Sequence, residues 1–281
     1  MTDQKIIITG ANGFIGSALV KHFQKKGWNV IALVHVLPKK PLDEVVYVSY
    51  DLTNEPPEGA FEDADVLIHC AYIRNDFLKN VKGTKVLLEQ SRKHGLKKNI
   101  FLSSFSAHED AVTKYGKQKL ELERSFSGEG DVNIRAGIVL GEGGLFGEMR
   151  EHIKKGKRVP LIDGGTQPMQ SIHVDDLVMI IDKVVDKNIS GTFTVAEEEP
   201  ISYKLFFTAI FQKLDLKPKF IRVPFGLINF ALSITEALHI PMPVAKENVL
   251  GLKFIKFRET KKDLEKLGVK VRSFNESLKA L

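Results

Sequence analysis

Short apolar runs and helical patterns alternate along the first two thirds of the chain. The apolar runs are rich in Val, Ile and Leu at successive positions, which is typical of strands buried on both faces. Seven runs are predicted as strands: residues 5–9, 28–34, 45–48, 65–71, 99–103, 132–139 and 192–195. Four segments with apolar residues at helical spacing are predicted as helices: residues 15–26, 75–94, 113–127 and 175–187. This alternation predicts an α/β fold with a doubly wound parallel sheet covered on both faces.

The pattern changes near Ala196, where short helices replace the strand–helix alternation. Prolines at positions 218, 224, 241 and 243 interrupt this part of the chain. We expect one domain over residues 1–196 and a smaller, mainly helical substrate lobe over residues 197–281. Residues 140–172 are expected to contribute to the substrate side as well. Thr260 is a candidate cap for a short helix over residues 261–267.

One long apolar stretch, residues 223–240, needs a separate interpretation. It contains Pro224 and Glu236, which make it a poor candidate for a membrane span. We expect a buried or groove-lining helix here, and a membrane-surface helix is the alternative. The phenylalanines of this region would suit a partly apolar ligand: Phe220, Phe225 and Phe230.

The composition is that of an ordinary globular protein. The chain has 281 residues, of which 43% are hydrophobic and 27% charged, with a net charge of +6. The basic residues form no dense run, so a small anionic molecule is a better expected partner than nucleic acid. Cys70 is the only cysteine and cannot form an internal disulfide, which fits a cytoplasmic protein, and we see no targeting segment. The eight histidines show no metal-ligand spacing, so we expect no metal.

A glycine-rich turn is the first feature that carries chemistry. Gly10, Gly13 and Gly16 follow the first predicted strand and open the first predicted helix. In this context glycines permit a tight turn, let a pyrophosphate approach the backbone and let the helix pack on the strand. The turn therefore predicts a dinucleotide-binding site, whose remaining members are Asn12, Phe14 and Ile15.

Eight segments, in chain order, resemble the motifs of one family. They are TGANGFIG at residues 9–16, DL at 51–52, HCA at 69–71, NVKGT at 80–84, LSS at 102–104, YGKQK at 115–119, RAGIVLG at 135–141 and IHVDD at 172–176. Together they resemble extended and atypical short-chain dehydrogenases/reductases, the NAD-dependent epimerase/dehydratase superfamily. The resemblance covers about residues 5–195 and implies a Rossmann-type sheet, an NAD(P) cofactor and a small-molecule substrate. A homodimer is one assembly that it leaves open.

The resemblance also implies cofactor contacts outside the glycine turn. Asp51 and Leu52 correspond to a pair at the end of the third strand, where the acidic residue touches adenine. Further positions beside the cofactor are Cys70, Ala71, Tyr72, Asn80 and Ser103.

Tyr115 and Lys119 are the candidate proton-transfer pair. Their spacing of four residues places both side chains on one face of a helix. A nearby ammonium favours the phenolate, so Lys119 would lower the pKa of Tyr115. In the family, the lysine also bonds the nicotinamide ribose, and a serine corresponding to Ser104 bonds the substrate oxygen. Ser103 and Ser106 are the nearest competitors of Ser104, and a purely structural Tyr115 with a solvated Lys119 is the alternative.

Two departures from the family pattern bear on the substrate. The interval between Ser104 and Tyr115 is shorter than in most sugar-nucleotide epimerases. Met169 stands where those epimerases carry an arginine that grips the substrate phosphates, and a thioether cannot neutralise phosphate. Some atypical family members share the short interval, whereas the missing arginine argues against a nucleotide-sugar substrate. His173 and Asp175 are expected to be architectural, with Asp175 as a helix cap.

The end of the second strand bears on the choice of cofactor. NAD-preferring relatives place an aspartate there, whereas this chain has His35, followed by Lys39 and Lys40. His35 occupies a position that is often arginine in NADP-preferring relatives, so we favour NADP over NAD. Two solvated lysines are the alternative explanation of positions 39 and 40.

Three functions remain open from the sequence. The first is an NAD(P)-dependent oxidoreductase in which Ser104, Tyr115 and Lys119 handle the proton. The second is a sugar-nucleotide epimerase or dehydratase, against which Met169 counts. The third is a non-catalytic dinucleotide-binding sensor or assembly protein, which would have no need of the complete Ser–Tyr–Lys set.

Overall fold

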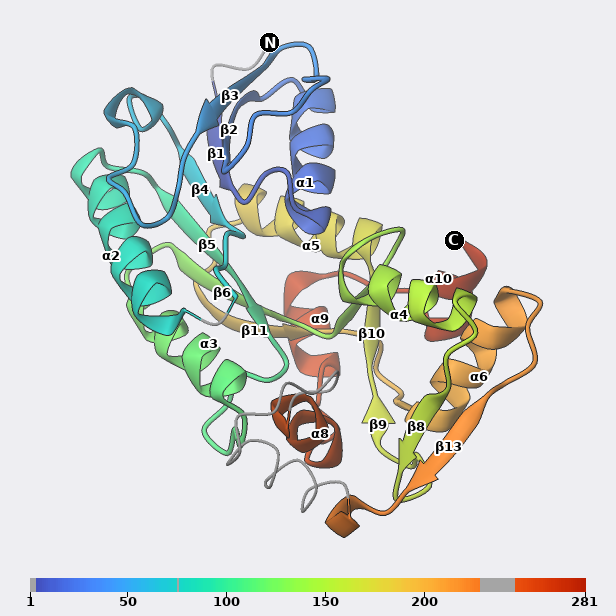
Figure 1. Ribbon diagram of the computed structural model, residues 1–281. Coiled ribbons are helices and arrows are strands. Elements are labelled where there is room, and N and C mark those ends of the chain that lie inside the picture. Colours follow the sequence, from blue (N-terminus) through green and yellow to red (C-terminus); the bar gives the residue numbers. More distant parts are fainter. Residues whose placement is uncertain (1–3, 75, 228–245) are drawn as a thin grey trace.

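A seven-stranded parallel sheet organises the first part of the chain (Figure 1). The computed structural model describes residues 4–74, 76–227 and 246–281. The strand order is β11-β6-β5-β4-β1-β2-β3. The strands are β1 (Lys5–Thr9), β2 (Asn29–Val34), β3 (Val45–Ser49), β4 (Val66–His69), β5 (Lys98–Ser104), β6 (Asp131–Ala136) and β11 (Gly191–Val195). The strand order reverses between β1 and β4, and this reversal creates a crevice at the carboxyl ends of the strands.

Helices cover both faces of this sheet. They are α1 (Phe14–Lys25), α2 (Phe77–Lys93), α3 (Lys114–Ser125) and α5 (Val174–Asp186). Figure 1 shows α1 and α5 along one face and α2 and α3 along the other. The prediction of a doubly wound parallel sheet is therefore confirmed.

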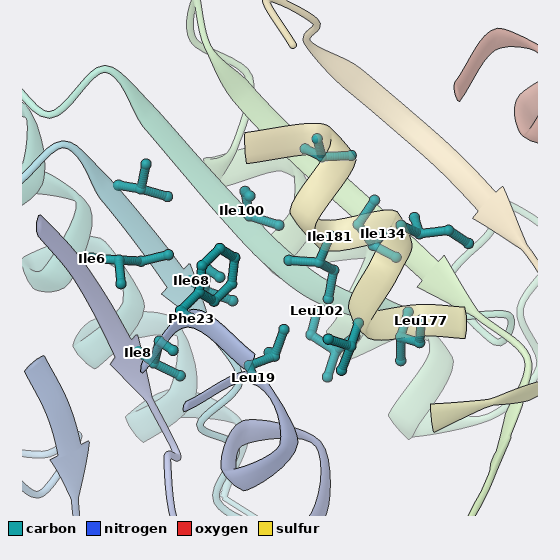
Figure 2. Packing of buried hydrophobic residues seen from close by; sticks show 14 of the residues in the cluster. Ile6, Ile8, Leu19, Phe23, Ile68, Ile100, Leu102, Ile134, Leu177 and Ile181 are labelled. Carbon is teal, nitrogen blue, oxygen red and sulfur yellow. The ribbon is translucent and has the colours of Figure 1, made fainter. Parts of the chain in front are cut away.

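The alternation of side chains along β1 explains why its three central residues are all apolar. Ile6 and Ile8 point into the core under α1 and α5, where they join Leu19 and Phe23 of α1 (Figure 2). Ile7 points to the opposite face and packs with a second group of buried residues on that side. Each of these three isoleucines is 0% exposed. A strand buried on both faces needs apolar side chains pointing both ways, and the centre of β1 has them.

A second, smaller lobe has its own apolar core. It contains α4 (Gly144–Lys154), β8 (Val159–Ile162), β9 (Pro168–Met169), β12 (Ile201–Ser202), α6 (Tyr203–Lys213), β13 (Phe220–Val223) and α10 (Phe274–Lys279). Phe146, Phe206 and Phe274 meet in this core, with the rings of Phe206 and Phe274 4.8 Å apart. Segments before and after residue 196 thus build the lobe together.

Two further helices follow the smaller lobe's strands. α8 (Lys246–Lys253) lies against the amino end of α3, where Glu247 accepts a hydrogen bond from the backbone N–H of Lys114 at 2.6 Å. α9 (Lys261–Leu267) returns to the sheet, and its Leu264 and Leu267 are buried in the same core as Ile6.

The predicted strand over residues 132–139 is in fact two strands. The chain leaves the main sheet at Gly137 and continues as β7 (Ile138–Leu140), which pairs with β10 (Ser171–His173). A Cβ at position 137 would lie 2.6 Å from the carbonyl oxygen of Gln170, so glycine permits this close approach.

The helix caps differ from the expectation at one position. Thr113 is the N-cap of α3, because its side chain accepts a hydrogen bond from the backbone N–H of Gly116. The prediction that Asp175 caps the next helix is wrong. His173 is the N-cap of α5, with Nδ1 accepting from the backbone N–H of Asp175 at 3.2 Å. Thr260 precedes α9 as expected but makes no side-chain cap bond.

The apolar stretch over residues 223–240 lies mostly outside the described residues. Phe225 is described and packs edge-on against Phe254, whereas Phe230 lies outside the described part. Phe220 packs against Phe211 of the smaller lobe. Among the helices that the structure describes, none has the length and apolar composition to cross a membrane.

Candidate active site

The glycine turn after β1 joins two loops at the reversal point of the sheet. Gly10 has φ of +64°, a conformation that favours glycine, and a Cβ there would lie 2.8 Å from the backbone nitrogen of Ala71. A Cβ at Gly16 would lie only 2.2 Å from the carbonyl oxygen of Gly10, so glycine lets α1 pack against the turn. Both positions therefore require glycine for backbone packing.

Gly13 differs from these two glycines. It is the N-cap of α1, with an extended backbone and no side-chain cap, and no acidic residue lies in the first turn. A Cβ at position 13 would meet only the Gly10 oxygen, at 3.0 Å. The first N–H groups of α1 are thus offered to an anion together with the helix dipole. This arrangement fits the pyrophosphate of a dinucleotide.

The other residues of the turn connect it to neighbouring loops. The Asn12 side-chain amide donates to the carbonyl oxygen of Val36 beyond β2. The Phe14 ring lies over a glycine-rich segment, because Cβ atoms at Gly141 and Gly143 would lie within 2.9 Å of it. Ile15 packs against the main core.

The ends of β2 and β3 meet in an ion pair. His35 Nδ1 lies 3.2 Å from Asp51 Oδ2, and the His35 side chain is 76% exposed. Thr53 donates to Asp51 through its hydroxyl and its backbone N–H, and these bonds lower the pKa of Asp51. The segment after β2 has no carboxylate of its own at His35. Asp51, which follows β3, therefore brings a carboxylate to this position.

A shallow hollow of about 230 Å³ lies next to this pair. Leu52, Lys79, Lys82 and Gly83 are among the residues that line it. A Cβ at Gly83 would lie 2.0 Å from the Leu52 carbonyl oxygen, so glycine lets α2 approach the end of β3. Two lysines thus lie beside the expected adenosine end of the site.

A buried hydrogen-bonded chain under the turn was not foreseen in the sequence. The backbone N–H of Ala71 donates to Thr9 Oγ1 at 3.1 Å, and Thr9 Oγ1 lies 2.7 Å from His69 Nδ1. His69 Nε2 lies 3.0 Å from Thr84 Oγ1, so both ring nitrogens have a threonine hydroxyl as partner. Burial lowers the pKa of His69 to about 3, and the neutral ring therefore connects β1, β4 and α2 as a structural element. Beside it, burial raises the pKa of the Cys70 thiol to about 12.

Asn80 organises the loop that follows β4. Its amide nitrogen donates to the carbonyl oxygens of Ile73 and Asp76, at 2.8 and 2.7 Å, and its oxygen accepts from the Ile73 N–H at 2.8 Å. Asn80 is 1% exposed. Asn80 therefore holds the loop that carries Tyr72, and its place beside a cofactor stays a prediction.

Ser104 and Tyr115 are brought together at the carboxyl edge of the sheet. The two side chains come from β5 and α3 and lie close enough for the Ser104 hydroxyl to influence the pKa of Tyr115. Gly116 makes the approach possible, because a Cβ there would lie 2.3 Å from the Ser106 carbonyl oxygen. Burial raises the pKa of Tyr115, while the nearby Ser104 hydroxyl and the charge of Arg74 act in the opposite direction. The phenol therefore carries its proton at neutral pH.

Lys119 lies one helical turn further along α3 and is 5% exposed. Its amine donates to the Leu102 carbonyl oxygen at 2.9 Å and lies 4.8 and 4.6 Å from the ring centroids of Tyr72 and Phe101. Burial lowers the pKa of Lys119 to about 8. The expected lowering of the Tyr115 pKa by Lys119 is not seen, because the amine is directed to Leu102 and burial of the phenol has the larger effect.

A neighbouring carboxylate distinguishes the two adjacent serines. The Ser103 hydroxyl donates to Glu123 on α3, and Arg135 forms two further bonds to the same carboxylate, at 2.6 and 2.9 Å. Ser103 is thereby committed to a buried ion pair, whereas Ser104 faces Tyr115. Ser106 contributes its backbone N–H, which donates to Ser104 Oγ at 3.2 Å.

The departures noted in the sequence lie on the substrate side. Met169 is 3% exposed and belongs to the core of the smaller lobe, so its position offers no charge to a ligand. Within the described part of the chain, no group of three His, Cys, Asp or Glu side chains is placed to hold a metal ion.

The comparisons with known proteins agree with this geometry. The chain is 27% identical over 237 residues to a 3-diazoavenalumate denitrifying reductase of Streptomyces, covering 70% of this chain and 77% of that protein. It is 23% identical over 274 residues to the chloroplastic divinyl chlorophyllide a 8-vinyl-reductase of Arabidopsis thaliana, covering 84% of this chain but only 64% of that reductase.

The fold is also shared with solved structures. The UDP-glucose 4-epimerase of Thermotoga maritima, solved with UDP-glucose, superposes with a TM-score of 0.75 at 20% identity, covering 98% of this chain and 96% of the epimerase. The sequence profile of one family matches residues 6–196, which is more than half of the chain. The chain therefore belongs to the NAD dependent epimerase/dehydratase family.

Proposed function

We propose that the protein is an NAD(P)-dependent oxidoreductase that reduces or oxidises a carbon–oxygen group of a small substrate. The observation that carries this proposal is the proximity of the Ser104 and Tyr115 side chains at the carboxyl edge of the sheet. Ser104 lies at the end of β5, the strand next to β4. The loop that follows β4 contacts the glycine turn. Hydride transfer from a bound dinucleotide requires a phosphate cradle and a proton donor at the same edge of the sheet, and β1 and β5 provide them on either side of β4.

The residues around α1 fit a bound dinucleotide. Its nicotinamide would supply or accept the hydride. The uncapped N-terminus of α1 would bind the pyrophosphate, and Asp51 and Leu52 would lie at the adenosine end. We favour NADP because β2 ends with His35, and because Lys79 and Lys82 line the adjacent hollow and would attract a 2′-phosphate. The carboxylate of Asp51 opposes this preference, so the choice is a matter for measurement.

In this proposal the side chains divide the work of proton transfer. Tyr115 gives its proton to the substrate oxygen, and its raised pKa keeps it protonated for reduction. Ser104 donates a hydrogen bond to the same oxygen and orients the phenol. Lys119 has two N–H donors beyond its bond to Leu102, and these would bind ribose hydroxyls.

A conservative substitution of the proposed acid tests the mechanism. A substrate is first found by following NADPH and NADH oxidation with aldehydes, ketones and nucleotide sugars. Tyr115→Phe keeps the ring and removes the hydroxyl, so turnover should fall by about 10²-fold or more while cofactor affinity changes little. Ser104→Ala should lower turnover with the cofactor still bound. Near-normal turnover by Tyr115→Phe would refute the mechanism and favour a non-catalytic dinucleotide-binding protein.

A sugar-nucleotide epimerase or dehydratase is the second candidate, favoured by the shared fold with UDP-glucose 4-epimerase. The buried Met169 counts against it, because this position provides no cation for the substrate phosphates. The nucleotide sugars in the substrate panel decide between the two candidates.

A further inference from the structure

Tyr72 contacts both members of the proposed proton-transfer pair. Its ring meets the ring of Tyr115 edge-on, with centroids 5.6 Å apart and planes at 88°. The Lys119 amine lies 4.8 Å from the centroid of the same ring. The Tyr72 hydroxyl donates to the side-chain oxygen of Gln118 at 2.6 Å, and Gln118 directly precedes Lys119 on α3. One side chain from the loop after β4 thus touches three positions of the catalytic helix.

The backbone holds this ring in place independently of α3. On one side of Tyr72, the N–H of Ala71 is bonded to Thr9 Oγ1 at 3.1 Å. On the other side, Asn80 bonds both the N–H and the carbonyl oxygen of Ile73 at 2.8 Å. The residues flanking Tyr72 are therefore fixed to β1 and α2. The loop can act as a rigid support for the contacts that its ring makes with α3.

The Lys119 amine is enclosed by two aromatic rings. Phe101 lies on the amine's other flank at 4.6 Å from its ring centroid, and the amine donates to the Leu102 carbonyl oxygen at 2.9 Å. The titratable groups that act on this amine are the Cys70 thiol and the Glu123 carboxylate, and the amine itself depresses the pKa of His69. Covering by aromatic rings excludes water from the amine, although the ring faces also attract a cation.

These two effects of the rings on the amine oppose each other. Burial is the largest influence on the pKa of Lys119 and lowers it to about 8, despite the opposite action of Cys70 and Glu123. The two rings that enclose the amine contribute to this burial. Removal of the Tyr72 ring would admit water to the amine and free one edge of Tyr115.

We propose that Tyr72 is a positioning residue, whose ring shields the Lys119 amine from water and holds the Tyr115 ring toward Ser104. It acts through these two side chains and has no part of its own in the proton transfer. The functional meaning of this role rests on the proposed function of Tyr115 and Lys119. The shielding itself is a property of the folded chain and is measurable without a substrate.

The test is a pH titration of the Lys119 amine by nuclear magnetic resonance. The protein carries isotope-labelled lysine, and the Lys119 signal is assigned by its absence from the Lys119→Met variant. Tyr72→Phe keeps the ring and loses the hydroxyl, so its titration midpoint should stay near the wild-type value. Tyr72→Leu and Tyr72→Met remove the ring, and their midpoints should rise by about one pH unit or more.

The matched control is Tyr203→Leu, which removes a buried tyrosine from the smaller lobe and should leave the Lys119 midpoint unchanged. Tyr72→Met is included because a flexible thioether fills a vacated ring site with little strain, so a folded non-aromatic variant is obtained even if Tyr72→Leu does not fold. An unchanged midpoint in the folded non-aromatic variants overturns the proposal, as does an equal rise in Tyr72→Phe.

A second readout links the shielding to the cofactor. Calorimetric titration with NADPH over a range of pH should show affinity declining as Lys119 loses its proton, and this decline should move to higher pH in Tyr72→Met. A decline at the same pH as in the wild-type protein would contradict the positioning role. Failure of the proposed function would instead appear as normal turnover by Tyr115→Phe, so the two failures are distinguishable.

Discussion

Lys119 should reduce the stability of the folded protein, and the size of this effect follows from its pKa. The amine is buried, and its pKa falls from 10.5 to about 8 on folding. A tenfold change in an acid dissociation constant corresponds to about 1.4 kcal/mol, so the buried ammonium costs roughly 3 kcal/mol at neutral pH. Its hydrogen bond to the Leu102 carbonyl returns about 1 kcal/mol.

The Lys119→Met variant should therefore be more stable than the wild-type protein. Methionine keeps an unbranched apolar chain between the rings of Tyr72 and Phe101 and removes the charge. We expect a gain of about 2 kcal/mol in the free energy of unfolding near neutral pH. The same variant should bind cofactor weakly and turn over slowly, because the ribose donors are lost.

The sign of the pH dependence provides an independent check. Below the folded pKa of about 8, both folded and unfolded chains bind the proton, so the penalty is constant. Between this value and the unfolded pKa of 10.5, the unfolded chain binds more protons, and the wild-type protein gains stability as pH rises. The difference between Lys119→Met and the wild type should shrink across this window.

Urea unfolding at several pH values measures this difference. Lys98→Met is the control, because Lys98 is also buried but its amine donates to the carbonyl oxygens of Val184, Lys187 and Ile189. That variant should be less stable than the wild type, since three carbonyl groups lose their donor. A Lys119→Met protein that is less stable than the wild type at neutral pH would refute the reasoning, as would a stability difference that is independent of pH.

Two further predictions concern the cofactor. Gly13→Val should leave the fold intact, because position 13 has an extended backbone and a Cβ there meets only the Gly10 oxygen, yet it should abolish dinucleotide binding in calorimetry. Gly16→Val is the contrasting variant and should lower the melting temperature, since a Cβ at position 16 would lie 2.2 Å from the Gly10 oxygen. Normal cofactor binding by a folded Gly13→Val protein would contradict the placement of the pyrophosphate. NADPH should bind more tightly than NADH in the same assay, and His35→Ala should reduce this preference. Tighter binding of NADH would show that the effect of the Asp51 carboxylate on cofactor choice is larger than that of His35.

The sheet and the glycine turn could be predicted because their determinants are local. A strand with consecutive isoleucines such as β1 shows its double burial in its own sequence, and Gly10 stands directly between a strand and a helix. The division of the strand at Gly137 could not be predicted. Its cause is the approach of the Gln170 backbone, which is distant in the sequence.

The candidate site shows the same limit at the level of side chains. Motifs placed Ser103, Ser104, Tyr115 and Lys119 near one another, but they could not decide which serine faces the tyrosine. That choice depends on Glu123, which engages Ser103 and Arg135 from a different element. The direction of the Lys119 amine depends likewise on the Leu102 carbonyl and on two aromatic rings from β5 and the loop after β4.

The return of α9 to the main core has a consequence for how the chain folds during synthesis. The sheet's core includes Leu264 and Leu267, which leave the ribosome after every strand of the sheet has been made. The earlier part of the chain therefore emerges before two residues of its main core are available. The core can be completed only once α9 has been made, so the last stage of folding depends on a late segment of the chain.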